Sequence, residues 1–203
     1  MTILLLIRHG DNDHLQKKIL YGDMPGVHLN ERGHQQAADL AAALKSASLK
    51  AIYCSPLERA VETAQPLAQT TGLPIQIVPG LSDPAIGAWT GRPLKELRKL
   101  VAWKVVQKTP SQFRFPGGES FLEVQARIVA ALEAIGHAHR KTDRVAVVFH
   151  ADPIKLAVAH YLGMPLDHFQ RMGIGTGSLT ILVHGKGSAV LTALNLQPPF
   201  PLP

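Results

Sequence analysis

The sequence lacks the features that mark membrane-spanning and disulfide-rich secreted proteins. Cys54 is the single cysteine among 203 residues, so no disulfide can form within the chain, and a cytoplasmic location is expected. The apolar run from Ile3 to Ile7 ends at Arg8 and is far shorter than the ~20 residues that a membrane-spanning helix needs. It also lacks the basic flank and cleavage site of a secretory signal. We therefore expect no membrane partner.

Aromatic and acidic residues are also scarce. Aromatic residues make up 5% of the chain, and the lysines and arginines are scattered rather than gathered in blocks. Both observations argue against a nucleic-acid partner, which needs a basic patch and aromatic rings for base stacking. Lys and Arg number 21 against 15 Asp and Glu, which gives a formal charge of +6. This excess favours a smaller anionic partner, such as a phosphorylated small molecule.

The rest of the composition is that of a folded domain. Hydrophobic residues make up 46% of the chain, which is enough for a core and excludes overall disorder. Strand-like segments at 2–7, 50–54, 74–78 and 144–149 alternate with helix-like segments. The expected helices lie at 31–45, 55–71 (with Ser55 as N-cap and Pro56 as first helical residue), 94–107, 119–139 and 152–162. This alternation predicts an α/β fold with a largely parallel sheet.

The chain length favours one domain, which we place at 1–203. Residues at about 80–120, which open on a loop rich in glycine and proline at 80–93, form an expected lid-like helical insertion. Two strands at 178–183 and 189–194 are expected to form a hairpin around 184–187. An exposed edge of this hairpin can pair with a second copy of the chain, so a homo-oligomer is one of the expected states. The proline-rich tail at 197–203 is expected to dock loosely or fray.

Residues that follow the strands are the first candidates for chemistry, because ligands of such sheets bind beyond the carboxyl ends of the strands. Arg8-His9-Gly10 follows the first strand, Ser55-Pro56 the second, and His150 the strongly apolar strand before it. Arginine matches phosphate geometrically, and histidine serves as nucleophile, base or ligand. Arg59 lies in the first turn of the helix after Ser55. The alternative interpretation makes the histidines structural and Arg59 a surface residue paired with a neighbouring glutamate.

The motifs resemble those of the histidine phosphatase superfamily, also called phosphoglycerate mutase-like. The resemblance covers most of the chain, in the order of that family. The matching stretches are LIRHG (6–10), GDMPGVHLNERGHQQA (22–37), CSPLERAVETA (54–64), GAWTGRPLKEL (87–97), FPGGES (115–120) and VVFHADPIKLAVAHYLGMP (147–165). Within the family, the chain is most similar to a short bacterial phosphatase branch.

The resemblance implies a three-layer α/β/α sandwich around a mostly parallel, mixed sheet. It also implies a metal-independent phosphatase that needs no cofactor and hydrolyses a phosphate monoester through a phosphohistidine on His9. Arg8, Arg59 and His150 would bind the phosphate together with His9, and His150 would also take part in catalysis. Two arginines and a donating histidine can balance the charge of a phosphoryl group in the transition state. No compact His, Cys and Asp cluster suggests a metal site.

Several positions depart from the family pattern. Asp83 stands where a glutamate usually acts as general acid, and Pro84 restricts its backbone. Asp11 and Asp152 are the alternative acids. Asn12 replaces a hydroxyl residue that often contacts phosphate, and its amide can still donate. Leu15 replaces an asparagine and cannot.

These departures leave two alternatives to the phosphatase prediction. One is phosphoglycerate mutase-type phosphoryl transfer, although Leu15 and the short chain favour a phosphatase. The other is a weakly active or inactive protein that binds phosphorylated ligands.

Overall fold

A mixed sheet forms the centre of the molecule. The computed structural model describes residues 1–185 and 188–200, and this part of the chain holds a six-stranded sheet in the order β4-β3-β6-β1-β7-β8. Strands β4, β3, β6 and β1 are parallel, whereas β7 and β8 pair antiparallel. The bounds are β1 (Thr2–Arg8), β3 (Leu49–Cys54), β4 (Ile75–Ile77), β6 (Arg144–Phe149), β7 (Leu179–Gly185) and β8 (Ser188–Leu196). The predicted α/β fold with a mostly parallel, mixed sheet is confirmed.

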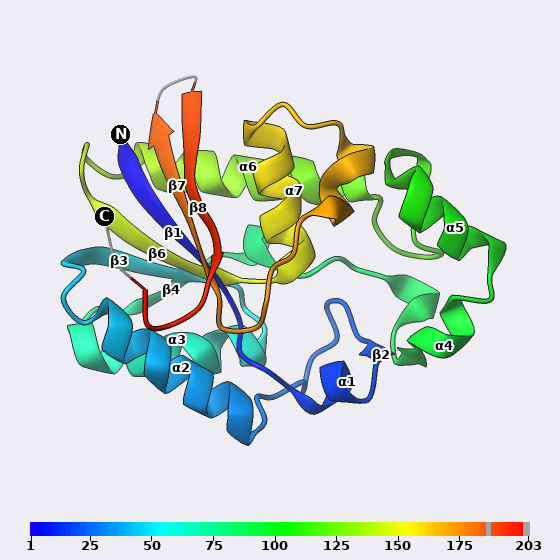
Figure 1. The fold of residues 1–203 in the computed structure, drawn as a ribbon, viewed down its shortest axis with the longest axis horizontal. Helices are drawn as coiled ribbons and strands as arrows, with labels where there is room; N and C mark the ends of the chain where they lie inside the picture. The colour runs from blue at the N-terminus through cyan, green and yellow to red at the C-terminus, as the bar shows by residue number, and fades with distance from the viewer. Residues whose placement is uncertain (186–187, 201–203) are drawn as a thin grey trace.

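Helices cover both faces of the sheet (Figure 1). The pair α2 (Glu31–Leu44) and α3 (Glu58–Thr71) lies on one face, and α6 (Phe121–His137) and α7 (Ala151–Tyr161) lie on the other. Side chains of β1 alternate between the two layers: Leu5 and Ile7 belong to the core on the α2 and α3 side, and Leu4 and Leu6 to the other core. Each buried leucine or isoleucine contributes about 1.5–3 kcal/mol to the burial free energy.

The second long helix begins later than predicted. Helix α3 starts at Glu58 after Leu57, and no side chain caps its N-terminus. The prediction that Ser55 caps this helix and Pro56 begins it is therefore wrong. The Ser55 hydroxyl instead lies 2.8 Å from Nε2 of His150. The Ser55 hydroxyl thus contacts a residue 95 positions away along the chain instead of capping the helix.

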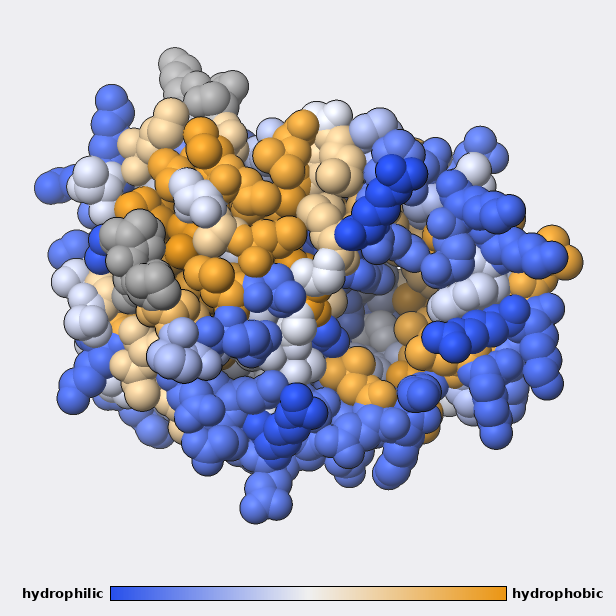
Figure 2. All heavy atoms as spheres, viewed as in Figure 1, coloured by the Kyte–Doolittle hydropathy of each residue, from blue (hydrophilic) through white to orange (hydrophobic). Residues whose placement is uncertain are grey.

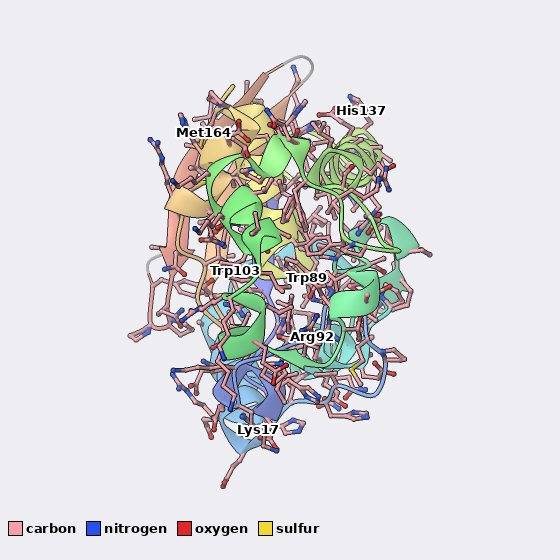
Figure 3. The ribbon with its side chains drawn as sticks, turned by 90° about the vertical axis from the view of Figure 1, so that its right-hand side faces the viewer. Lys17, Trp89, Arg92, Trp103, His137 and Met164 are labelled. Atoms are coloured by element: carbon pink, nitrogen blue, oxygen red, sulfur yellow. The ribbon has the colours of Figure 1, made fainter. Side chains whose placement is uncertain are left out.

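The segment between β4 and α6 contains more short structure than predicted. It holds the 3₁₀ turns η1 (Pro79–Leu81), η2 (Gly87–Trp89) and η3 (Pro110–Gln112), strand β5 (Arg92–Pro93), and helices α4 (Leu94–Leu97) and α5 (Val101–Lys108). The predicted helix at 94–107 is broken because Leu100 is extended, with ψ of 142°. Trp89 and Trp103 lie close together in this segment, with their ring centroids 6.0 Å apart (Figure 3).

Three other short elements were not predicted: α1 (Asp13–Gln16), β2 (Ile19–Leu20), which pairs with β5, and η4 (Leu166–Arg171). Helix α6 begins at Phe121 rather than 119, because Ser120 and Glu123 form a capping box. The predicted hairpin is confirmed as β7 and β8. Residues 186–187 of its turn and 201–203 of the expected tail lie outside the described residues. Within the described part of the chain, no helix is long and apolar enough to cross a membrane.

Candidate active site

Two histidines meet at the carboxyl edge of the sheet. His9 follows β1 and His150 follows β6, and these strands are parallel neighbours. The backbone N–H of His9 donates to the carbonyl of Phe149 at 2.9 Å, and the two imidazole centroids are 5.2 Å apart. Both side chains are buried. The two strand ends thus converge as the sheet topology predicts.

The surroundings of His9 leave one ring nitrogen free for chemistry. Its Nδ1 lies 2.7 Å from the carbonyl of Gly10, so Nδ1 carries the hydrogen and Nε2 keeps its lone pair. Burial, followed by the charges of Arg8 and Arg59, holds the pKa of His9 well below its usual value. His9 is therefore a neutral imidazole at pH 7, which is the nucleophilic form.

The loop after His9 depends on a close backbone crossing. A Cβ at Gly10 would lie 2.6 Å from the carbonyl oxygen of Gly33, and a Cβ at Gly33 would lie 2.1 Å from that of Asp11. No side chain fits at either position. The N-terminal turn of α2 thus fixes the backbone directly after the histidine.

Arg59 is fully buried, which contradicts its alternative interpretation as a surface residue. Its guanidinium lies 4.8 Å from the ring centroid of Tyr21 and donates to the carbonyl of Gly22 at 2.6 Å. It also donates to Oδ2 of Asp83 at 3.2 Å. Stacking and hydrogen bonding thus hold this arginine in one orientation.

Several buried nitrogens of this cluster have no hydrogen-bond partner among the described residues. They are Nε of Arg8, Nε of Arg59 and Nδ1 of His150. The other contacts of these residues are satisfied: Nη1 of Arg8 donates to the carbonyl of Ile174 at 2.6 Å, and Nε2 of His150 faces Ser55. Buried polar groups are normally paired, so unpaired donors of two guanidinium groups beside an unpaired imidazole nitrogen indicate a site for an anion.

Asp83 is the carboxylate closest to this cluster. Its Oδ2 lies 3.7 Å from Nδ1 of His150, and its side chain is 14% exposed. Burial raises its pKa to about 7, although the nearby Arg59 charge opposes the increase. A carboxyl with this pKa exchanges a proton near neutral pH, as a general acid must. The shorter side chain of aspartate still reaches Arg59 and His150.

The other candidates are engaged in contacts of their own. The Asn12 amide caps α1 by accepting from the backbone of Leu15 and donates to the Tyr21 hydroxyl at 3.1 Å. Asp11 accepts from its neighbour's backbone N–H and from Gln16 at 3.0 Å. Neither Asn12 nor Asp11 lines the pocket described below.

Asp152 does line this pocket, but it is paired with another side chain. Its carboxylate lies 2.9 Å from the Lys155 ammonium. As an acid, Asp152 would first have to leave this ion pair.

The sequence did not predict the hydrogen bonds that hold the backbone around Asp83. Arg127 of α6 forms a bidentate pair with Glu119, at 2.7 and 2.9 Å. The same guanidinium donates to the carbonyls of Gly80, Ser82 and Asp83, at 3.0, 2.7 and 3.1 Å. Glu119 also accepts from the backbone of Ala85 at 2.8 Å. The glutamate in FPGGES was a visible signal, whereas nothing near Arg127 in the sequence indicates these partners.

A pocket of about 300 Å³ opens onto Arg8, His9 and Asp83. It is walled by the α1–β2 segment, the start of α7, Leu94 of α4 and Ile174. Figure 2 shows the molecule hollowed at this place, with apolar and charged residues at the rim. The volume is at the lower end of the range for small-molecule sites. Within the described residues, no group of three or more His, Cys, Asp or Glu side chains could hold a metal ion.

The fold and site together define a class of protein: an α/β enzyme with a neutral histidine facing an arginine-lined anion site at the carboxyl edge of its sheet. The sequence profile of the histidine phosphatase superfamily (branch 1) matches residues 4–197. The chain belongs to this superfamily, and its enzyme class is that of a phosphatase.

Relatives in the superfamily span nearly the whole chain. A 2,3-bisphosphoglycerate-dependent phosphoglycerate mutase from Thermoplasma acidophilum is 31% identical and covers 90% of this chain and 87% of its own. An adenosylcobalamin/alpha-ribazole phosphatase from Escherichia coli is 28% identical over 95% of both chains. The crystal structure of a phosphoserine phosphatase from Entamoeba histolytica has a TM-score of 0.86, 25% identity, and 98% coverage of both chains.

Proposed function

We propose that this protein hydrolyses a phosphate monoester, without a metal ion or other cofactor, through a phosphohistidine on His9. The observation that carries the proposal is the free Nε2 of a neutral His9 beside unpaired buried nitrogens of Arg8, Arg59 and His150. These groups fit the three non-bridging oxygens of a phosphoryl group, whose charge is about −1.5 to −2 at neutral pH.

In the first step, the lone pair on Nε2 of His9 attacks phosphorus, and the bond from phosphorus to the ester oxygen breaks. Asp83 gives its proton to that oxygen, and the alcohol leaves. Arg8 and Arg59 stabilise the charge that spreads over the other oxygens. His150 donates from Nδ1 while Ser55 fixes its ring.

In the second step, the Asp83 carboxylate takes a proton from water as that water attacks phosphorus. The phosphorus–nitrogen bond breaks, and inorganic phosphate and neutral His9 are regenerated. Two steps replace one difficult displacement, which is the advantage of a covalent intermediate. Asn12, which the sequence suggested as a phosphate contact, donates to the Tyr21 hydroxyl and is proposed to orient that residue of the pocket wall.

Phosphoryl transfer of the phosphoglycerate mutase type is the second candidate, because one relative with 31% identity carries that name. Leu15 favours hydrolysis over transfer, because it replaces an asparagine that often contacts phosphate.

We also propose that residues 1–203 form one domain, in which the segment at about 80–120 serves as a lid over the pocket. Pro84, Ile86, Leu94 and Phe115 of this segment line the pocket, which supports that role. The single cysteine, buried at Cys54, supports a cytoplasmic location.

The central test is hydrolysis of 4-nitrophenyl phosphate by the wild-type protein and by His9→Ala. We expect the substitution to abolish turnover, and we expect acid quenching during turnover to trap an acid-labile phosphoenzyme in the wild type alone. Activity should survive dialysis against EDTA. Equal rates for wild type and variant across a panel of phosphate esters would refute the phosphatase. Isomerisation of phosphoglycerate faster than its hydrolysis would favour the mutase.

A further inference from the structure

The pocket beyond the phosphate cluster has an unusual chemistry for a site that handles esters of sugars or polyols. Among the described residues, its lining contains no serine, threonine, asparagine or glutamine. Beyond Arg8, His9 and Asp83, the polar side chains of the lining are those of Tyr21, Lys18, Asp152 and Lys155. Most of the remaining wall is aliphatic or aromatic and includes Leu15, Ile19, Leu20, Ile86, Leu94 and Phe115. A hydroxyl group placed against the apolar part of this wall would lose its water and find no side-chain partner there, which is unfavourable.

The apolar wall is rigid at its aromatic part. Phe115 is 5% exposed and packs edge-to-face on Trp89 and on Phe113, with centroids 5.5 and 5.1 Å apart. Phe121 contacts the same ring at 5.3 Å. Because other aromatic rings pack on Phe115 from several sides, its ring cannot turn away, and the apolar surface of this wall is fixed. The site is therefore preorganised for an apolar ligand.

The charged groups of the pocket do not supply a second strong anion site. The ammonium of Lys155 lies 2.9 Å from the Asp152 carboxylate, so its charge is already paired. Lys18 is exposed at the rim, where an ion pair is worth little. The unpaired donors are gathered at the opposite end, around Arg8 and His9.

Resting on the proposed function, we propose that the substrate is the phosphate monoester of a largely apolar alcohol, with an aryl or branched alkyl body. The phosphate occupies the site at Arg8, Arg59, His9 and His150, and the alcohol fills the apolar part of the 300 Å³ pocket. Esters of sugars and of glycerol are poor substrates because their hydroxyl groups lose hydration without compensation.

The test compares substrates whose leaving alcohols have similar acidity, so that binding of the alcohol body decides the result. We expect kcat/KM for benzyl phosphate to exceed that for glycerol 3-phosphate and glucose 6-phosphate by about tenfold to a hundredfold, because a phenyl-sized body is buried. Similar or higher values for the two polyol esters would overturn the substrate inference and leave the phosphatase proposal intact.

A matched pair of variants locates the effect in the pocket. Ile19→Thr replaces a pocket residue, whereas Ile77→Thr makes the same change at a position of β4 that is 48% exposed and outside the pocket. Ile19→Thr should lower kcat/KM for benzyl phosphate by about threefold to tenfold, with little change for glycerol 3-phosphate. Ile77→Thr should change neither. Equal losses on both substrates in Ile19→Thr would contradict the inference.

A binding measurement keeps the inference testable even if no ester is hydrolysed. Calorimetry with benzylphosphonate and 2-hydroxyethylphosphonate, which have no cleavable ester bond, reports affinity alone. The expected result is at least tenfold tighter binding of benzylphosphonate. Equal affinities would overturn the apolar substrate class, whereas tight benzylphosphonate binding without any hydrolysis would overturn the phosphatase proposal alone.

Discussion

At the scale of single residues, Asp83 combines two opposing influences. Burial disfavours its charge and Arg59 favours it, and the result is a pKa of about 7. The same carboxylate contacts Arg59 at 3.2 Å and lies 3.7 Å from His150, so its protonation changes the charge of the whole phosphate site. This position allows one side chain to give a proton in the first step and take one in the second.

Asp83→Asn should therefore affect substrates according to their leaving group. We expect kcat/KM for an alkyl phosphate to fall by about 10²–10⁴, which is the usual contribution of a general acid. 4-Nitrophenyl phosphate should lose far less, because its leaving anion needs no proton. The same experiment with Asp11→Asn and Asp152→Asn should show no dependence on leaving group. An equal loss on both substrates in Asp83→Asn would reassign this residue to a structural role.

The pH profile should show the same acid. Asp83 must be protonated in the first step, so kcat/KM for an alkyl phosphate should fall as pH rises above about 7. The pKa of His9 is lowered, so no loss from its protonation is expected until the pH is well below 6.5. The ratio of alkyl to nitrophenyl rates removes the effects that both substrates share, such as protonation of His9. A ratio that stays constant from pH 6 to 9 would contradict this assignment.

Residue identities were more predictable than residue geometry. The family motifs pointed to His9, Arg8, Arg59 and His150, and the structure brings these four residues together, although the strand-end pattern alone had left structural roles open for them. The position of the Asp83 carboxylate was not predictable, because it depends on hydrogen bonds from Arg127. This arginine lies 44 residues further along the sequence. The contact between Ser55 and His150 joins residues separated by 95 positions, and a local pattern suggested a helix cap instead.

At the scale of elements, the segment that carries Asp83 is held by α6 rather than by its own secondary structure. Arg127 donates to the carbonyls of Gly80, Ser82 and Asp83, and Glu119 receives the backbone N–H of Ala85. The guanidinium fork is suited to this arrangement because it donates in several fixed directions. Arg127 is thus a positioning residue for the carboxylate.

Arg127→Lys should keep the positive charge but lose the planar guanidinium group, which donates in several fixed directions. We expect kcat/KM for an alkyl phosphate to fall by about tenfold to a hundredfold, because small displacements of a catalytic group are costly. Nitrophenyl phosphate should lose less than threefold, roughly, since it does not need the acid. Arg114→Lys is the control, because Arg114 forms an exposed pair with Glu123. A loss in Arg127→Lys that is equal for both substrates would indicate general destabilisation instead.

Long elements were predicted well and short ones poorly. The strands and long helices follow their hydrophobic periodicity, whereas α1, β2, β5 and the 3₁₀ turns are two to six residues long. Such elements are fixed by tertiary contacts, as in the pairing of Ile19 with Pro93. The break at Leu100 has the same origin, because no glycine or proline marks it.

At the scale of the whole molecule, the site joins distant parts of the chain. It draws on the end of β1, the first turn of α3, the segment before η2 and the end of β6. A ligand that bridges these parts binds the folded state alone and stabilises the entire fold. Inorganic phosphate, the proposed product, is the simplest such ligand.

Inorganic phosphate at a hundredfold excess over its Kd should add about 2.7 kcal/mol to the free energy of unfolding. For a chain of this size the Tm should rise by roughly 5–10 °C. Differential scanning calorimetry measures the change, with sodium chloride at equal ionic strength as the control. Arg8→Gln should reduce the shift, because it removes one of the unpaired donors. An unchanged Tm in saturating phosphate would contradict the anion site.

The strand order also has a consequence for synthesis of the protein on the ribosome. Strand β1 pairs with β6 and β7, whose residues follow it by more than 140 positions, as His150 follows His9. At an elongation rate of about 5–20 residues per second, the strand that carries His9 waits roughly 7–28 s for its partner. A nascent chain therefore exposes His9, the proposed nucleophile, long before it can bind phosphate, and activity should be absent until translation has passed β6.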